Sequence, residues 1–246
     1  MSDVVAVIPA RLGSTRFPRK VIYPYRGKPL LAHVHNEISK SKQINRLIVA
    51  TDSIEIKNIV DDFGGETIMT SKRHRTGSDR VAEVAKKIDG SLIVNIQADN
   101  FGVKASVLDR IIIQMKKKTS MQFATLAYRL QSDNELYNPN IVKVVTTKNG
   151  HALWFSRSPI PYLRNVGSSK HTTQYQFLGH IGIYLYRRSS LLQFARWKRS
   201  DLEKAESLEQ LRILGNSGRI DVFKTKMRTV SVDAREDLNK LDEIYK

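Results

Sequence analysis

The chain has 246 residues and a formal net charge of +17, with 41 lysines and arginines against 24 aspartates and glutamates. It contains no cysteine, which excludes disulfides, thiolate catalysis and cysteine-ligated zinc. No apolar run approaches the length of a membrane span, and the N-terminal stretch does not resemble a signal peptide, so we expect a cytoplasmic protein without membrane insertion.

The first part of the chain alternates strands with helices. Val4–Ile8 is a continuous apolar run, typical of a strand covered on both faces, and Pro9 marks its end. Helices are predicted at 28–40, 54–63 (capped by Ser53) and 78–90 (capped by Ser78), and strands at 46–53, 66–71 and 92–99. This alternation favours a mostly parallel sheet with helices on its faces.

The second part is richer in strands. We expect helices at 107–118, 205–214 and 235–246, and strands at 122–129, 141–146, 151–156, 180–187, 219–224 and 229–233. No repeat or low-complexity linker divides the chain. The prediction is therefore one α/β domain over residues 1–246, with a Rossmann-like, mostly parallel sheet and a strand-rich insertion.

The surplus of positive charge is confined to two segments. Residues 4–36 hold six cations and no carboxylate, and residues 136–200 hold ten cations and no carboxylate. Elsewhere the two signs nearly cancel. Two explanations fit this distribution of charge: the two segments converge on anionic ligands, or they form a basic surface that binds RNA.

A basic loop with a glycine follows the first predicted strand. Arg11, Arg16, Arg19 and Lys20 surround Gly13. Ligands of open α/β sheets bind at the carboxyl ends of the strands, where a glycine-containing loop can direct backbone N–H groups at an anion. The spacing matches neither GxGxxG nor the P-loop. A phosphate-binding loop and a solvated basic turn both fit these residues.

Two aspartates follow predicted strands that lie far apart in the sequence. Asp99 ends the strand 92–99, and Asp233 follows the apolar stretch TVSV. Two strand-end carboxylates suit a Mg²⁺ site shared with phosphate oxygens. Spacing alone favours the alternative that Asp233 caps the final helix.

Other polar residues have two interpretations each. Ser78 and Arg80, at a predicted helix start, fit an anion or base contact or an ordinary capped helix. Arg157 precedes two prolines and fits either carboxylate recognition or a structural ion pair. His180 and Tyr184 share one face of a strand, which usually means core packing.

Taken together, these stretches resemble a known family. The blocks IPARLGSTRFPRK, ATDS, MTS…GSDRVAEV, VNIQAD, NPNIVKVV, ALWFSRSPIPY, HIGIYLYR, ESLEQLRIL and VDAREDL occur in the order, and at about the spacing, of 3-deoxy-manno-octulosonate (Kdo) cytidylyltransferases, also called CMP-Kdo synthetases. The resemblance runs from Val4 to the C-terminal helix.

The resemblance implies a nucleotidyltransferase fold and a reaction. Enzymes of this family join CTP and Kdo, release pyrophosphate, and make CMP-Kdo for lipopolysaccharide. CTP and an acidic sugar would be the substrates, Mg²⁺ the cofactor and a homodimer the assembly, while nucleic acid would not be a partner. The anomeric hydroxyl of Kdo would attack the α-phosphorus in line with the departing pyrophosphate.

The resemblance also implies roles for individual residues. The CTP triphosphate would be held by Ala10, Arg11, Ser14, Arg16 and Lys20. Cytosine and ribose contacts would fall on Thr70, Ser78, Arg80 and Gln97. The Mg²⁺ ligands would be Asp99 and Asp233, which form the catalytic set with Lys20 and Arg16. The sugar acid would be surrounded by Arg157, His180, Tyr184, Glu209 and Gln210.

Three stretches depart from the family pattern. The family usually has QGDEP where this chain has residues 97–101 (QADNF), RxPGK where it has 16–20 (RFPRK), and Thr-Pro where it has Ala234 and Arg235. Both expected metal ligands remain. These changes bear on the turnover and on the choice of sugar. Two alternatives to a Kdo cytidylyltransferase therefore stay open: a cytidylyltransferase for an amino-substituted Kdo or a nonulosonate, and a weakened relative that binds nucleotide or RNA.

Overall fold

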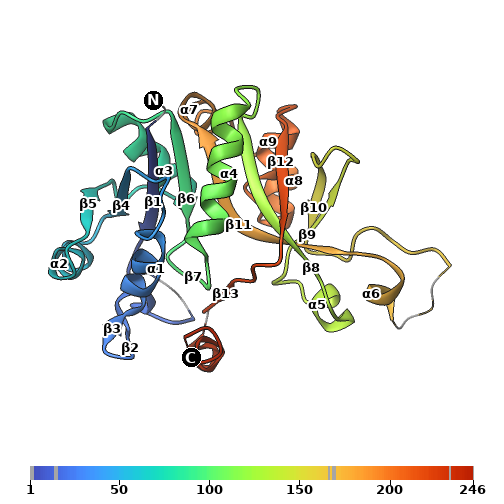
Figure 1. The fold of residues 1–246 in the computed structure, drawn as a ribbon, viewed down its shortest axis with the longest axis horizontal. Helices are drawn as coiled ribbons and strands as arrows, with labels where there is room; N and C mark the ends of the chain where they lie inside the picture. Colours follow the sequence, from blue (N-terminus) through green and yellow to red (C-terminus); the bar gives the residue numbers. More distant parts are fainter. Residues whose placement is uncertain (1–2, 14–15, 166, 168–169, 233, 246) are drawn as a thin grey trace. The chain divides into compact units, whose positions relative to one another are not determined.

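The computed structural model describes residues 3–13, 16–165, 167, 170–232 and 234–245 (Figure 1). The chain divides into two compact units. Unit 1 comprises Met1–Lys118, Leu185–Ala195 and Met227–Lys246, and unit 2 comprises Thr119–Tyr184 and Arg196–Lys226. A single nucleotidyltransferase domain over 1–246 stays a prediction. Within the described ranges, no helix combines the length and the apolar character needed to cross a bilayer.

Unit 1 is built on a parallel sheet. Its strands follow the order β6 (Leu92–Ile96), β1 (Val4–Ala10), β4 (Arg46–Thr51) and β5 (Glu66–Met69). Each neighbouring pair is parallel, with Val7 opposite both Ile48 and Asn95. Every residue of β1 is buried, which is why its sequence is a continuous apolar run. The predicted α/β class and parallel sheet are confirmed.

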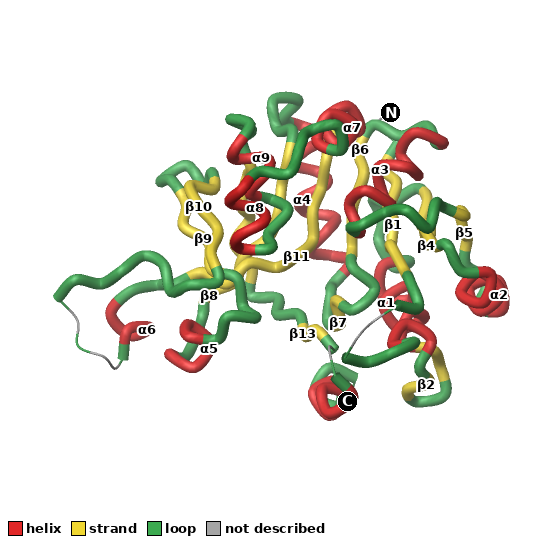
Figure 2. The backbone as a smooth tube through the Cα atoms, turned by 180° about the vertical axis from the view of Figure 1, so that it is seen from behind, coloured by secondary structure: helices red, strands yellow, loops and turns green. Residues whose placement is uncertain are grey.

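Helices accompany this sheet (Figure 2). They are α1 (Leu30–Ile38), α2 (Ile54–Asp62), α3 (Gly77–Lys87), α4 (Ala105–Lys117) and α7 (Arg188–Phe194), the last of which the sequence did not predict. Ser53 caps α2 as predicted. The predicted cap of α3 was wrong: the Thr76 hydroxyl accepts from the N–H of Asp79, so the helix begins earlier and Ser78 lies buried inside it.

Short strands join distant parts of unit 1. A hairpin consists of β2 (Pro24–Tyr25) and β3 (Lys28–Pro29). The antiparallel pair β7 (Asn100–Phe101) and β13 (Val230–Ser231) brings the segment after Asp99 beside the segment that ends at Val232. This pairing is the structural basis for the site described below.

The helix predicted at 235–246 is present as a shorter 3-10 helix, Arg235–Leu241. The apolar residues Leu238, Leu241 and Ile244 of this C-terminal segment recur every third position, which matches three residues per turn. The segment is attached to the β2–β3 hairpin, because the Tyr25 hydroxyl donates to Asp242 at 2.6 Å.

Unit 2 contains the strand-rich part of the chain. Its strands β8 (Phe123–Arg129) and β12 (Ile220–Thr225) are parallel, β9 (Lys143–Thr146) and β10 (Ala152–Ser156) are antiparallel, and β11 (Leu178–Arg187), which continues into unit 1, pairs with β8 and β9. Two short helices, α5 (Asp133–Tyr137) and α6 (His171–Gln174), were not predicted.

The helix predicted at 205–214 was also wrong. The structure has two short helices here, α8 (Asp201–Glu206) and α9 (Leu211–Gly215), because Ser207 adopts a left-handed conformation with φ of 52°. A fully buried Glu203 joins them: its carboxylate accepts from Arg212 Nε at 2.7 Å and Nη2 at 2.6 Å. This buried pair stabilises the break that local helical periodicity does not indicate.

Candidate active site

The basic loop leaves the carboxyl end of β1. Ala10 is the last, buried residue of the strand, and Arg11 and Arg16 are exposed. The loop is closed by a hydrogen bond from Arg19 N to Leu12 O at 3.1 Å. Ser14 lies outside the described residues. The structure therefore places two arginines at the sheet edge where α/β proteins bind ligands.

Lys20 is the buried cation of this loop. Its side chain is 10% exposed, and its Nζ lies 2.8 Å from Asp99 Oδ2 and also donates to the carbonyl oxygen of Val232. The pairing of β7 with β13 and the bonds of Lys20 hold the same two segments together. Lys20 thus links the phosphate-binding candidates to Asp99 and to the residue before position 233. Asp233 itself lies outside the described residues.

Asp99 has the chemistry of a magnesium ligand. Its carboxylate is 30% exposed and accepts from Lys20 through one oxygen. Within the described ranges, no cluster of three or more histidines and carboxylates could hold a metal by itself. Mg²⁺ is usually bound through one or two carboxylates, with phosphate oxygens and water completing its shell. Asp99 fits that pattern.

Residues that depart from the family pattern near Asp99 lie largely in the interior of unit 1. Phe101 is fully buried and lies opposite Val230 in the β7–β13 pair, and Ala98 is 7% exposed. The ring of Phe101 therefore packs in the core. Asn100, the third departing residue of this stretch, is polar and partly exposed.

Two of the expected base-contacting residues form one cluster. Arg80, 4% exposed, donates through Nη1 to the Thr70 hydroxyl, and its Nη2 lies 3.1 Å from Asp52 Oδ2. The guanidinium joins the end of β5 to the turn after β4. Sequence reasoning missed Asp52, although its place directly after a buried strand was a usable signal.

The other two, Ser78 and Gln97, meet through Asn95. Asn95 Nδ2 donates to Ser78 Oγ at 3.3 Å, and Gln97 Nε2 donates to Asn95 Oδ1 at 3.1 Å. A Cβ on Gly77 would lie 3.0 Å from Gln97 Oε1, so the glycine allows this close approach. Asn95 was also missed, although an amide inside an apolar strand indicated a buried polar contact.

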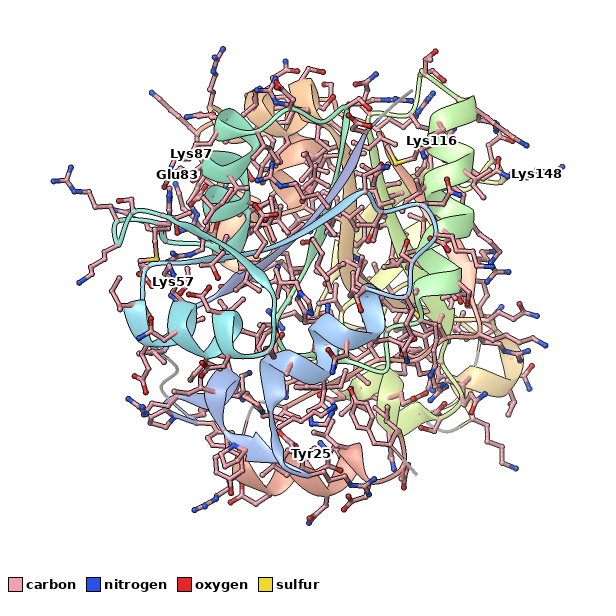
Figure 3. All side chains as sticks on the ribbon, turned by 60° about the vertical axis from the view of Figure 1, so that its left-hand side comes forward. Tyr25, Lys57, Glu83, Lys87, Lys116 and Lys148 are labelled. Carbon is pink, nitrogen blue, oxygen red and sulfur yellow. The ribbon has the colours of Figure 1, made fainter. Side chains whose placement is uncertain are left out.

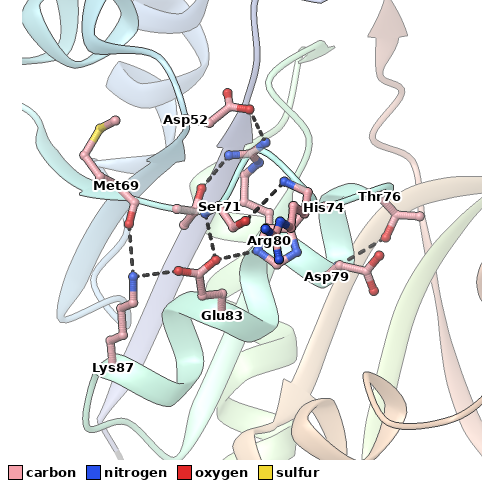
Figure 4. A network of polar contacts seen from close by, with 11 residues as sticks. Asp52, Met69, Ser71, His74, Thr76, Asp79, Arg80, Glu83 and Lys87 are labelled. Atoms are coloured by element: carbon pink, nitrogen blue, oxygen red, sulfur yellow. Dashed lines mark hydrogen bonds and ion pairs between the residues drawn. The ribbon is translucent and has the colours of Figure 1, made fainter.

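Glu83 on α3 fixes the segment after Thr70 (Figure 4). Its carboxylate accepts from the N–H of Ser71 at 2.9 Å, from His74 Nε2 at 2.5 Å and from Lys87 Nζ at 2.7 Å, and Lys87 lies beside it on the same helix (Figure 3). Burial acts to raise the pKa of Glu83, but the hydrogen bonds from Lys87, Ser71 and His74 outweigh it and lower the pKa from 4.5 to about 2.

Replacing Glu83 with glutamine is expected to lower the free energy of unfolding by about 2 kcal/mol at pH 7, because the charged form makes these bonds. Since the folded pKa is depressed, the difference from wild type is full above pH 4.5 and shrinks as the pH falls toward about 2. Urea unfolding across this pH range measures it. Glu66→Gln, in an exposed pair with Arg46, is the control, with an expected change of about 0–1 kcal/mol. Equal losses in both variants would contradict the prediction.

The expected sugar-binding residues all lie in unit 2. Arg157 follows β10, and its Nε and Nη1 donate to the carbonyl oxygens of Glu206 at 2.7 Å and Pro139 at 2.9 Å. Its backbone N–H donates to the Glu206 carboxylate at 2.9 Å. Arg157 therefore anchors two loops, and its Nη2 donates to the carbonyl oxygen of Ser207 at 3.5 Å. A guanidinium carries five N–H donors, so donors remain for a ligand.

His180 and Tyr184 lie on one face of β11, as the sequence indicated. Their ring centroids are 5.4 Å apart, and the Phe155 ring of β10 lies 5.0 Å from His180. Burial lowers the pKa of His180 to about 3, so the imidazole is neutral at physiological pH. The structure thus brings His180 and Tyr184 together, and Phe155 connects them along β10 to Arg157.

Glu209 and Gln210 lie in the turn between α8 and α9. Gln210 is buried and directly precedes α9, while Glu209 is half-buried. The neighbouring Glu206 binds both Arg157 and, at 2.6 Å, the Ser156 hydroxyl. Glu206 was missed by sequence reasoning, because its role depends on a contact 50 positions along the chain.

Comparison with known proteins places the chain in a family. Residues 5–221 match the family described as Cytidylyltransferase. A 3-deoxy-manno-octulosonate cytidylyltransferase from Trichlorobacter lovleyi is 40% identical, with 99% of each chain covered. The chain belongs to the 3-deoxy-manno-octulosonate cytidylyltransferase family. A member from Geobacter metallireducens is 42% identical, over 98% of this chain and 96% of that one.

Solved structures agree with this membership. The structure of CMP:2-keto-3-deoxy-manno-octonic acid synthetase complexed with CTP is 35% identical, with a TM-score of 0.91 over 99% of this chain and 98% of that chain. A cytidylyltransferase from Leptospira borgpetersenii, 15% identical, shares the fold with a TM-score of 0.65 over 98% of this chain and 85% of that chain. The predicted family and the nucleotidyltransferase class are confirmed.

Proposed function

We propose that the protein transfers CMP from CTP to the anomeric hydroxyl of Kdo and releases pyrophosphate, as a step in lipopolysaccharide biosynthesis. The observation that carries this proposal is the full-length similarity to Kdo cytidylyltransferases. The lysine–aspartate pair at the end of the basic loop supports it, because phosphoryl transfer depends on cations around the transferred group.

On the nucleotide side, the basic loop neutralises the triphosphate. Arg11, Arg16 and Lys20 offer cationic donors near the carboxyl end of β1, and Lys20 holds Asp99 in place. Thr70, Ser78, Arg80 and Gln97 contact cytosine and ribose. Because Arg80 and Gln97 are held by Asp52 and Asn95, their donors are oriented before the nucleotide arrives.

Asp99 and Asp233 hold Mg²⁺ in this proposal. When bound, the ion supplies positive charge to the phosphate oxygens and lowers the pKa of a hydroxyl that it binds. The carboxylate of Asp99 and the carbonyl oxygen of Val232 both accept from Lys20, so this lysine keeps the two metal-binding segments in register. No dedicated protein base is then required.

On the sugar side, Arg157, His180, Tyr184, Glu209 and Gln210 recognise the acidic sugar. A guanidinium suits the sugar carboxylate, since both groups are planar and can form paired hydrogen bonds. The neutral imidazole of His180 suits an uncharged group such as a hydroxyl.

We also propose a cytoplasmic homodimer. Tyr162, in the proline-stiffened segment after Arg157, is 86% exposed, and aromatic side chains are enriched at protein–protein interfaces. Sedimentation of the wild type and of Tyr162→Asp tests this. A wild-type monomer would refute the dimer, and a dimeric variant would exclude Tyr162 from the interface.

The deciding experiment measures pyrophosphate release from CTP with Kdo and Mg²⁺. Release that depends on Kdo supports the proposal. Release only with an amino-substituted Kdo or a nonulosonate would replace the acceptor. No release with any sugar, together with binding of RNA, would indicate the weakened relative, whose basic surface is consistent with the charge of +17.

Replacing Arg16 with alanine is expected to weaken CTP binding by about tenfold and CMP binding by less than about twofold, because the two nucleotides differ in phosphate charge. Titration calorimetry with both nucleotides measures the two affinities. Lys28→Ala, in the exposed β2–β3 hairpin, is the control and should change neither. An equal loss for CTP and CMP would show that Arg16 has a structural role.

A further inference from the structure

Thr125, on β8, is a fully buried residue whose hydroxyl lies between a histidine and two backbone carbonyls. Its Oγ1 lies 2.9 Å from His180 Nε2, 2.8 Å from Ile183 O and 3.2 Å from Ile181 O. A threonine hydroxyl has one hydrogen to donate, and a carbonyl oxygen can only accept. A hydrogen donated to Nε2 would leave both carbonyl oxygens facing Oγ1 with no hydrogen between them, at 2.8 Å for Ile183 O. The hydrogen therefore goes to a carbonyl, and Oγ1 accepts from the imidazole.

This arrangement determines which nitrogen of His180 carries the hydrogen. Because Oγ1 accepts, Nε2 is the protonated nitrogen. Burial keeps the ring neutral, with the pKa of His180 lowered to about 3, so the ring has only one N–H. Nδ1 is consequently an acceptor at physiological pH.

The surroundings of His180 leave this acceptor available. Among residues 3–13, 16–165, 167, 170–232 and 234–245, no hydrogen-bond partner is found for Nδ1, and His180 as a residue is partly exposed. Gly182 shares the strand face of His180 and Tyr184, and a Cβ placed on it would meet no atom within 4 Å. Open space therefore lies beside the imidazole on this face.

We propose that Thr125 is a positioning residue for the sugar acid: it fixes the Nε2–H tautomer of His180, so that Nδ1 accepts a hydrogen bond from a hydroxyl group of the sugar. This rests on the proposed function, in which His180 contacts the sugar. A carboxylate at physiological pH can only accept, so an unprotonated Nδ1 disfavours it, whereas a hydroxyl can donate. His180 is thereby assigned to a hydroxyl, which leaves the sugar carboxylate to other donors such as Arg157.

Nitrogen NMR of histidine-labelled protein tests the tautomer without substrate. The chain has six histidines, and His180→Gln assigns the signals of His180. We expect Nδ1 of the wild type to resonate as an unprotonated nitrogen, Thr125→Ser to keep this signature, and Thr125→Val to lose it. A protonated Nδ1 in the wild type, or an unchanged signature in Thr125→Val, would overturn the proposal.

Steady-state kinetics test the consequence. In Thr125→Val the KM for Kdo is expected to rise about tenfold, the loss of one hydrogen bond, while the KM for CTP and kcat change less than about twofold. Thr125→Ser should restore the KM for Kdo. Thr67→Val, the same change on β5 of unit 1, is the control and should leave the NMR signature and the KM for Kdo unchanged.

The outcomes separate this inference from the proposed function. If Kdo supports pyrophosphate release but Thr125→Val lowers only the unfolding temperature, Thr125 is a packing residue and the inference is wrong while the function stands. If the wild type does not use Kdo, the proposed function fails, and the NMR signature alone then still decides whether Thr125 sets the tautomer. Gly182→Ala, which fills the open space, should raise the KM for Kdo without changing the tautomer; an unchanged KM would place the sugar elsewhere.

Discussion

Replacing Asp99 with asparagine is expected to lower kcat by about a hundred- to a thousandfold, and the same loss is expected for Asp233→Asn. Each change removes negative charge that would hold Mg²⁺ while keeping the size of the side chain. For Asp99 the change also replaces the carboxylate that pairs with the buried Lys20 by a neutral amide. Pyrophosphate release with CTP and Kdo, measured over a range of Mg²⁺ concentrations, checks the prediction.

The control uses a second lysine–aspartate pair in the same unit. Asp61 on α2 pairs with Lys57 four residues earlier, and both side chains are more than 40% exposed. Asp61→Asn is expected to change kcat by less than about twofold, because an exposed pair of this kind contributes little. Near-normal Mg²⁺-dependent turnover in either Asp99→Asn or Asp233→Asn would refute that residue as a metal ligand.

Much of the fold follows from local patterns. The apolar run at Val4–Ile8 predicted β1, and Ser53 with the periodic apolar residues after it predicted α2. These elements were predictable because the burial of a strand, or of one helix face, produces a pattern of apolar residues within a short stretch of sequence. The same reasoning failed at Ser207, where the buried pair of Glu203 and Arg212 stabilises a break inside an apparently continuous helix, because side-chain pairing between two successive helices is not part of the periodic pattern.

Some features of the candidate site could likewise be predicted from the sequence, and others could not. The basic loop and Asp99 could be placed at one sheet edge, because strand ends can be read from the sequence. The pairing of Lys20 with Asp99 could not, since 79 positions separate the two residues and only the packed sheet brings them together. Sequence reasoning missed Asn95, Glu206 and Thr125 for a related reason. They contact the expected site residues through hydrogen bonds, which cannot be predicted from the spacing of motifs.

Replacing Lys20 with methionine is expected to lower kcat/KM for CTP by about a hundredfold or more. Methionine keeps most of the side-chain volume in a site where the side chain is only 10% exposed, so the change removes charge with little loss of packing. The charge has three tasks in the proposed mechanism: it attracts the triphosphate, it pairs with Asp99, and it binds the carbonyl oxygen of Val232. A buried cation is screened less than an exposed one, which is why the expected loss is large.

Lys57→Met is the matched control, since Lys57 also pairs with an aspartate but is 41% exposed, and we expect its kcat/KM to stay within about twofold of wild type. If Lys20 and Asp99 act as one unit, the double variant Lys20→Met with Asp99→Asn should lose less than the product of the two single losses. Full multiplication of the losses would mean that the two residues act independently. A loss in Lys20→Met no greater than that in Lys57→Met would remove Lys20 from the site altogether, and the pair with Asp99 would then be an element of the fold alone.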